Sequence, residues 1–164
     1  MKATKKNKKV VTGKNGYVSV KLDSTDAKLV QEKIDAAGIT DAIKADKLHS
    51  TLFYSKAGLP DTLVAAGGML HTAFIKPTPM VIGEDPWRAL VLELDCPSLG
   101  LRHEEIKQST GAKHSYPDFL PHMSLKYNPS EDDIKLVGDA FAGMVIRLTN
   151  EEIEDITENP ADLD

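Results

Sequence analysis

The chain has 164 residues, 41% of them hydrophobic, and carries a formal net charge of −5 at pH 7. This length and composition predict one domain with a buried core, and the acidic balance argues against a protein that binds long nucleic acid, because such proteins present a basic surface to the phosphates. No apolar run approaches the roughly 18 residues of a membrane span, and the Lys-rich start lacks the hydrophobic stretch of a secretory signal, so we expect a cytoplasmic protein that does not bind membranes.

The first half of the chain predicts a strand, a helix and a second strand. The alternating run YVSVKLD, residues 17–23, is typical of a half-buried strand. Asp23 then supplies a helix cap before AKLVQEKIDAAG, and Gly38 closes this helix. A second alternating run, KLHSTLFYS at residues 47–55, is rich in β-branched and aromatic residues and is followed by a turn. Residues 63–75 predict one or two further strands.

The second half repeats this order after a Pro-rich segment. An apolar strand is predicted over WRALVLELD, residues 87–95, and a helix over residues 97–111, closed by Gly111. A loop then leads to a strand over HMSLKYN, residues 122–128. The pattern ends with a helix over EDDIKLVGDAFAG and a final strand over MVIRLTNEEIEDI.

Both halves follow a plan of strand, acidic cap, helix and strand, which indicates an internal duplication. The sequence therefore predicts an α+β protein with two pseudo-symmetric lobes, each a mostly antiparallel sheet with helices on its outer side. We expect a single bilobal domain over residues 10–156, with lobes at about 10–80 and 86–156. Residues 1–9 predict a basic flexible tail, and residues 157–164 predict an acidic tail.

The most distinctive feature is one short string that occurs twice: HSTLFY begins at His49, and HMSLKY begins at His122. Both copies read His, any residue, a hydroxyl residue, Leu, any residue, Tyr. Because alternate residues of a strand share a face, one face is expected to carry His49, Thr51 and Phe53 in the first copy and His122, Ser124 and Lys126 in the second. The Leu and Tyr side chains, on the opposite face, would anchor each strand in its own lobe.

Two such strands that face one another across a cleft would bring two imidazoles and two hydroxyls to one point. This set suits a phosphodiester substrate, because cleavage without a metal needs a base for the attacking hydroxyl, an acid for the departing oxygen and donors for the nonbridging oxygens. Histidine serves as either acid or base near neutral pH. We therefore expect His49 and His122 to form the acid–base pair, and Thr51 and Ser124 to donate to the phosphoryl oxygens, with no cofactor.

Two other interpretations of the histidines remain. They are either ordinary strand residues, which the repeated string disfavours, or ligands of a zinc ion. Three further histidines are available for a metal: His71, His103 and His114. However, the sequence contains no His-x-His or His-x-x-x-His spacing, no second cysteine and no carboxylate inside either string. We therefore expect no metal site.

The two strings resemble the signature of the two-histidine (2H) phosphoesterases, which reads His, any residue, Ser or Thr, and an apolar residue, once in each lobe. The resemblance implies a 2H phosphoesterase-like fold and a metal-independent phosphodiesterase that acts on 2′,3′-cyclic or 3′–5′ linked nucleotides. Within this superfamily, residues 10–156 are most similar to the phage anti-CBASS proteins. Similarity to these proteins implies degradation of cyclic di- and trinucleotide immune signals such as 3′,3′-cGAMP, in the host bacterial cytoplasm.

The narrower resemblance also implies residues that bind the substrate: an aromatic residue near the N-terminus and acidic residues in the last strand. Tyr17 matches the first, and Glu151 and Glu154, which we expect to share a face, match the second. Trp87 follows the Pro-rich segment and is expected at the cleft mouth, where it could stack on a base, and Lys126 is expected beside His122. The alternatives are core packing for the two aromatic residues and a solvated strand edge for the two glutamates.

Two alternative functions stay open at this point. One is an RNA-end enzyme that opens 2′,3′-cyclic phosphates, and the other is a sponge that sequesters a cyclic nucleotide without cleaving it. The two complete His and hydroxyl pairs argue against the sponge, because sequestration alone needs no acid–base groups. The sequence does not determine base preference, oligomeric state or which histidine is the acid.

Overall fold

The structure is a computed structural model, and it describes residues 10–116 and 118–158. Over these residues the protein is α+β, with a seven-stranded sheet in the order β2-β1-β7-β3-β5-β4 and β6 paired with β5. The strands are β1 Val10–Leu22, β2 His49–Tyr54, β3 His71–Ile75, β4 Met80–Ile82, β5 Ala89–Asp95, β6 His122–Tyr127 and β7 Val145–Glu158. The helices are α1 Ser24–Ala37, the short 3₁₀ helix η2 Ala45–Lys47, α2 Pro97–Thr110 and α3 Glu131–Val137. Every strand pair described is antiparallel, which confirms the predicted class.

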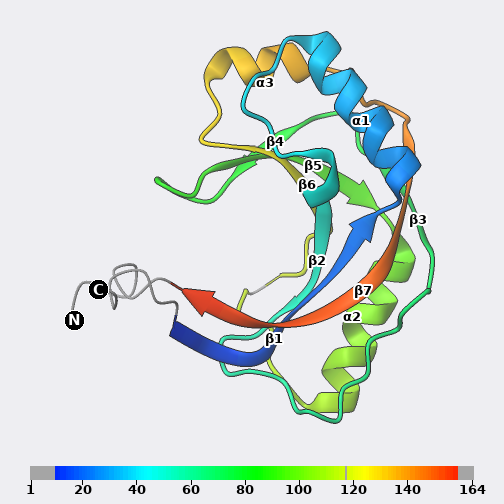
Figure 1. Ribbon diagram of the computed structural model, residues 1–164, viewed down its shortest axis with the longest axis vertical. Helices are drawn as coiled ribbons and strands as arrows, with labels where there is room; N and C mark the ends of the chain where they lie inside the picture. Colours follow the sequence, from blue (N-terminus) through cyan, green and yellow to red (C-terminus); the bar gives the residue numbers. More distant parts are fainter. Residues whose placement is uncertain (1–9, 117, 159–164) are drawn as a thin grey trace.

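The strands form a curved wall with its open side to the left in Figure 1. Helices α1 and α2 lie on the outer side of this wall, and α3 lies beside α1 at one end. The apolar side chains of β1 and β2 are buried against the helices, as Val20, Leu52 and Val30 illustrate. The helices in the described part of the chain are all too short or too polar to cross a membrane.

Local capping signals place the first helix as the sequence predicts. The Asp23 carboxylate accepts a hydrogen bond from the backbone N–H of Asp26, which satisfies one of the free donors of the first turn. Gly38 ends α1 with φ 82°, a left-handed conformation that glycine adopts without strain. Helix α3 is shorter than expected, because it stops at Val137 and the chain continues as turns through Gly143.

Other elements differ from the predictions. Strand β4 lies inside the Pro-rich segment, where no strand is predicted, and it pairs with β5. In the region of residues 63–75 only His71–Ile75 form a strand. Strand β7, from the end of the chain, lies between β1 and β3, so strands from the two ends of the sequence are neighbours in one sheet. The predicted tails fall largely outside the described residues, although β7 extends to Glu158.

Both motif strands contain a β-bulge at the same place. On β2, Thr51 pairs with Ser19 and Phe53 with Val18, so Leu52 has no partner on β1. On β6, Ser124 pairs with Val91 and Lys126 with Leu90, so Leu125 is the extra residue. Each bulge inserts one residue and reverses the alternation that follows it.

The bulges correct the predicted faces. Phe53 does not share the face of His49, because it is fully buried and stacks on the His103 ring. Tyr54 was expected on the opposite face, as an anchor of the strand, but it lies on the open side of the sheet and lines the cavity there. The same reversal moves Lys126 away from His122 and turns Tyr127 toward the open side.

Candidate active site

Each motif strand pairs with an antiparallel partner, β2 with β1 and β6 with β5, and the two registers match. Lys21 pairs with His49 and Glu93 with His122, and each hydroxyl residue pairs two positions further along. The strand pair β1–β2 is thus repeated by the pair β5–β6, bulge included. Strands β2 and β6 also contact one another, so the two repeated strands face the same space.

Each motif histidine is oriented by a backbone carbonyl two residues before it. The Nδ1 of His49 lies 2.8 Å from the oxygen of Lys47, and the Nδ1 of His122 lies 2.7 Å from the oxygen of Leu120. A carbonyl oxygen only accepts hydrogen bonds, so in both residues Nδ1 carries a proton. The Nε2 of each ring is therefore the atom that remains for acid–base chemistry.

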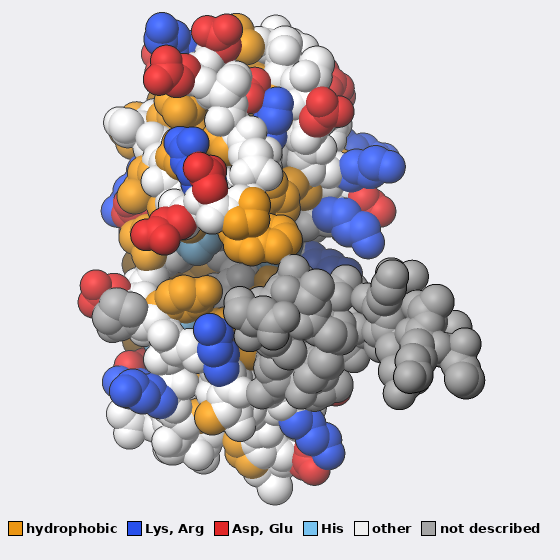
Figure 2. Space-filling view, turned by 90° about the vertical axis from the view of Figure 1, so that its left-hand side faces the viewer, with side chains coloured by type: hydrophobic (Ala, Val, Ile, Leu, Met, Phe, Trp, Pro, Cys, Tyr) orange, Lys and Arg blue, Asp and Glu red, His pale blue; other side chains and the backbone are white. Residues whose placement is uncertain are grey.

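Three of the four motif side chains, all but His49, line a cavity of about 630 Å³ on the open side of the sheet. Its polar wall includes Thr51, His122 and Ser124, and also Tyr17, which contacts His49. Figure 2 looks onto this side and shows histidine at the bottom of a hollow with hydrophobic side chains on either side of it. The volume lies within the range of small-molecule sites, about 300–1,000 Å³.

The two halves of the site differ at one position. The hydroxyl of Tyr17 lies 2.8 Å from Nε2 of His49 and 3.2 Å from Oγ1 of Thr51. At the matching position of the second strand pair stands Ala89, which has no polar side chain. Burial raises the pKa of Tyr17 above its usual 10.0, so the phenol stays neutral and can donate to the imidazole. Among the described residues, Nε2 of His49 thus has a hydrogen-bond partner within the protein and Nε2 of His122 has none.

Aromatic side chains make up much of the remaining wall: Trp87, Tyr54, Tyr116, Phe119 and Tyr127. Trp87 is 67% exposed, so it lines the cavity and does not pack in the core. The turn that leads to Trp87 requires a glycine at position 83. Gly83 has φ 80°, and a Cβ there would lie 2.9 Å from the carbonyl oxygen of Trp87. Tyr54 and Tyr127 were missed as cavity residues, although their recurrence at one place in both strings was the available signal.

The profile of the family described as anti-CBASS protein Acb1 matches residues 14–162. The chain belongs to this family. The anti-CBASS protein Acb1 of Vibrio phage KVP40 is 29% identical over 152 residues, which cover 89% of this chain and 90% of the relative. The Acb1 protein of Acinetobacter phage Ac42 is 29% identical over 149 residues, which cover 89% of this chain and 93% of the relative. The Acb1 protein of Enterobacteria phage T4 is 29% identical over 112 residues, which cover 68% of this chain and 71% of the relative.

In this member of the Acb1 family, Lys126 is turned away from the cavity. Its ammonium lies 2.9 Å from the Asp133 carboxylate, and its side chain is only 13% exposed. This ion pair and the Ser130 capping box hold the pKa of Asp133 below its usual range, with the hydrogen bond from the Ser130 backbone as the largest cause. The expectation that Lys126 lies beside His122 is wrong. The bulge at Leu125 shifts the alternation of side chains, so Lys126 points to the opposite face of the strand from His122.

The two glutamates of the last strand do not share a face. The side chain of Glu151 is buried, and its carboxylate binds Arg102 and the backbone N–H of Ala66. Glu154 is exposed and pairs with Tyr17 across the strands, which places it on the face of the cavity. Residues three apart in a strand point to opposite faces, so the expectation for Glu151 is wrong.

The other histidines each have a structural partner. His71 is fully buried with its Nδ1 2.7 Å from the Ser98 hydroxyl, and His103 donates from Nδ1 to the oxygen of Leu52 at 2.6 Å. The Nδ1 of His114 accepts a hydrogen bond from the backbone N–H of Tyr54. Over the described residues, no group of three or more His, Cys, Asp or Glu side chains is placed to hold a metal ion.

Proposed function

We propose that this protein is a metal-independent phosphodiesterase with a 2H phosphoesterase-like fold that hydrolyses cyclic di- and trinucleotides such as 3′,3′-cGAMP. By removing these signals in the host cytoplasm it would block CBASS immunity. Membership in the anti-CBASS family supports the biological role. The observation that carries the chemistry is the matched pair of histidines, each with Nδ1 bound to a backbone carbonyl, so that Nε2 is the atom that would meet the substrate, in place of Tyr17 at His49.

The asymmetry at Tyr17 supports an assignment of the two histidines. A neutral phenol that donates to Nε2 favours the unprotonated ring atom, and a general base must start unprotonated. We assign the base to His49 and the acid to His122. The ribose 2′-hydroxyl would take the place of the Tyr17 contact, lose its proton to Nε2 of His49, and attack the adjacent phosphorus.

The remaining steps use the same groups. The bond from phosphorus to the 5′-oxygen breaks, and Nε2–H of His122 protonates the departing oxygen. The hydroxyls of Thr51 and Ser124 would donate to the nonbridging oxygens, where negative charge builds up. The first product is a 2′,3′-cyclic phosphate. Water then enters by the reverse route, with the histidines exchanging roles, and leaves a terminal monophosphate.

The aromatic wall is the proposed base-binding surface. Tyr17, Trp87 and Tyr54 lie along the cavity and offer rings on which nucleobases stack, at about 1–3 kcal/mol per base. Glu154 is the proposed acidic contact, because it stands beside Tyr17 in the sheet. The cavity carries the aromatic and polar groups that a cyclic nucleotide requires.

The test is incubation with cyclic dinucleotides, cyclic trinucleotides and 2′,3′-cyclic mononucleotides in excess chelator, with products identified by mass spectrometry. We expect linear products from the cyclic oligonucleotides with the wild type and none with the double variant His49→Ala/His122→Ala. Unchanged masses with tight retention of ligand would show a sponge. Turnover of the 2′,3′-cyclic mononucleotides alone would show an RNA-end enzyme, and activity lost in chelator and restored by zinc would show a metalloenzyme.

A further inference from the structure

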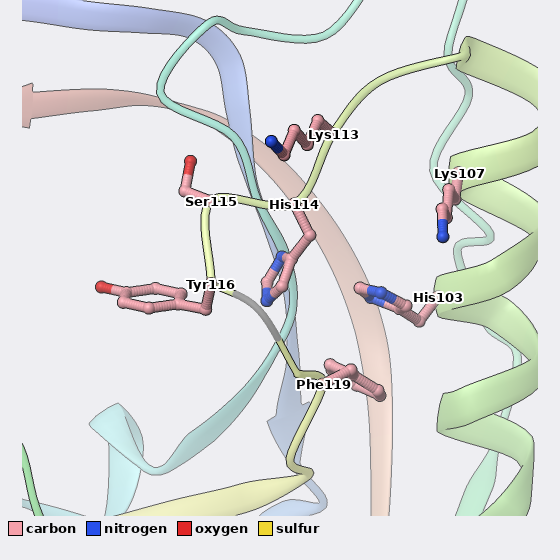
Figure 3. Close-up of a pocket in the computed structure, with 7 residues that line it drawn as sticks. All are labelled: His103, Lys107, Lys113, His114, Ser115, Tyr116 and Phe119. Carbon is pink, nitrogen blue, oxygen red and sulfur yellow. The ribbon is translucent and has the colours of Figure 1, made fainter.

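A second hollow, of about 410 Å³, lies beside the cavity, between α2 and the loop that leads to β6 (Figure 3). Its lining residues are His103, Lys107, Lys113, His114, Ser115, Tyr116 and Phe119. His114, Tyr116 and Phe119 line the main cavity as well. The two spaces are therefore separated by a wall of three rings, and one ligand can contact both sides of this wall.

Hydrogen bonds hold this wall to the end of β2. The backbone N–H of Tyr54 donates to Nδ1 of His114 at 3.1 Å, and the N–H of Ser115 donates to the oxygen of Tyr54 at 2.7 Å. On the other side, the rings of Phe119 and His103 stack with centroids 4.0 Å apart. The hollow is thus formed before any ligand arrives, which lowers the entropy cost of binding.

Three of the polar groups around the hollow are donors that carry no free acceptor: the two lysines and the His114 ring. His114 accepts at Nδ1, so its proton is on Nε2, and burial lowers its pKa to about 4, which keeps the ring a neutral N–H donor. Lys107 and Lys113 are exposed, and neither takes part in an ion pair in the described part of the chain. Figure 3 shows Lys107 on the helix, above His103, and Lys113 on the loop, next to His114. No carboxylate is among the lining residues.

Two lysines and an N–H donor in a lining that holds no carboxylate favour an anion, and the aromatic rings beside them favour a nucleotide. We propose, resting on the proposed function, that this hollow binds a phosphodiester of a third nucleotide and so adapts the site to cyclic trinucleotides. Lys107 and Lys113 bind this phosphate as point charges, away from the reacting linkage at His49 and His122. A cyclic dinucleotide is smaller and occupies the main cavity without reaching the two lysines.

The experiment compares kcat/KM for a cyclic trinucleotide and a cyclic dinucleotide in the variant Lys107→Ala/Lys113→Ala. The matched control is Lys28→Ala/Lys135→Ala, which removes two exposed lysines from α1 and α3. We expect the first variant to lower kcat/KM for the trinucleotide about tenfold, equivalent to about 1.4 kcal/mol. The kcat/KM of this variant for the cyclic dinucleotide should stay within about twofold of the wild type. The control variant should stay within the same limits for both cyclic nucleotides.

A binding measurement separates the subsite from the chemistry. In a His49→Ala/His122→Ala background, which cleaves neither ring, removal of Lys107 and Lys113 should weaken the trinucleotide Kd about tenfold and leave the dinucleotide Kd unchanged. If the wild type cuts neither ring, the proposed function fails and these Kd values alone decide the subsite. Equal losses for both rings, or no loss for either, would overturn the proposal. The linear product is tested as an inhibitor of the wild type and of Lys107→Ala/Lys113→Ala. If the variant is no longer inhibited by this product while its Kd for the cyclic trinucleotide is unchanged, the hollow is a product site and the proposal is overturned as well.

Discussion

The replacement Glu151→Ala separates a structural carboxylate from a ligand contact. The Glu151 side chain is 1% exposed and Arg102 is 8% exposed, and two hydrogen bonds of 2.9 and 2.7 Å join them. The same carboxylate accepts from the N–H of Ala66 at 2.7 Å, which ties down the loop before β3. Removing it leaves a buried guanidinium and a buried N–H without this partner. Breaking a buried pair from one side costs about 3–5 kcal/mol, or a fall in Tm of about 6–20 °C at about 2–4 °C per kcal/mol.

The assay is thermal unfolding, with the Kd of a cyclic dinucleotide measured well below the transition in the His49→Ala/His122→Ala background. Glu154→Ala is the matched control, because Glu154 is exposed on the face of the cavity. We expect Glu151→Ala to lower Tm and keep the Kd, and Glu154→Ala to keep Tm and weaken the Kd. A Glu151→Ala protein with the wild-type Tm and weaker binding would refute the structural role given to this carboxylate.

Replacing either His49 or His122 by Ala should lower kcat by about 10²–10⁴-fold with Kd retained, as single-turnover kinetics and calorimetry would show. Tyr17→Phe should lower the rate on cyclic dinucleotides less than either histidine replacement, since it removes one neutral donor, and an equal loss would contradict the positioning role. A ligand that lacks the 2′-hydroxyl at the attacked linkage should bind without being cut, and its hydrolysis at the normal rate would show direct attack by water. Burial lowers the pKa of His114 to about 4 in the folded protein, whereas in the unfolded chain it is about 6.5. The unfolded chain therefore binds a proton that the folded protein does not, and the free energy of unfolding should decrease as the pH is lowered from about 6.5 to about 4. Urea unfolding at about pH 7.5 and about pH 5 measures this loss of stability, which should be smaller in His114→Asn than in the wild type. An equal loss in both proteins would show that other groups cause it.

Several features of this protein follow from the sequence by itself, because local interactions decide them. The cap at Asp23 and the left-handed end at Gly38 depend on residues within one turn of the helix, so the bounds of α1 could be predicted. The duplicated strings predict His49 and His122 as candidate site residues, because the recurrence of a residue set can be read without knowing the strand register. Alternation of apolar residues was enough to predict an α+β protein with antiparallel strands.

The tertiary structure decided the features that depend on distant partners. The carbonyl of the bulged Leu52 accepts from His103, 51 residues away, and that of Leu125 accepts from the backbone of Ile43. A bulge exists only where a second strand pairs around an extra residue, so no pattern within one strand could show which faces Tyr54 and Lys126 take. Side-chain alternation reports the period of a strand, while register and partners over long separations are set by packing and by the need to satisfy every buried polar group.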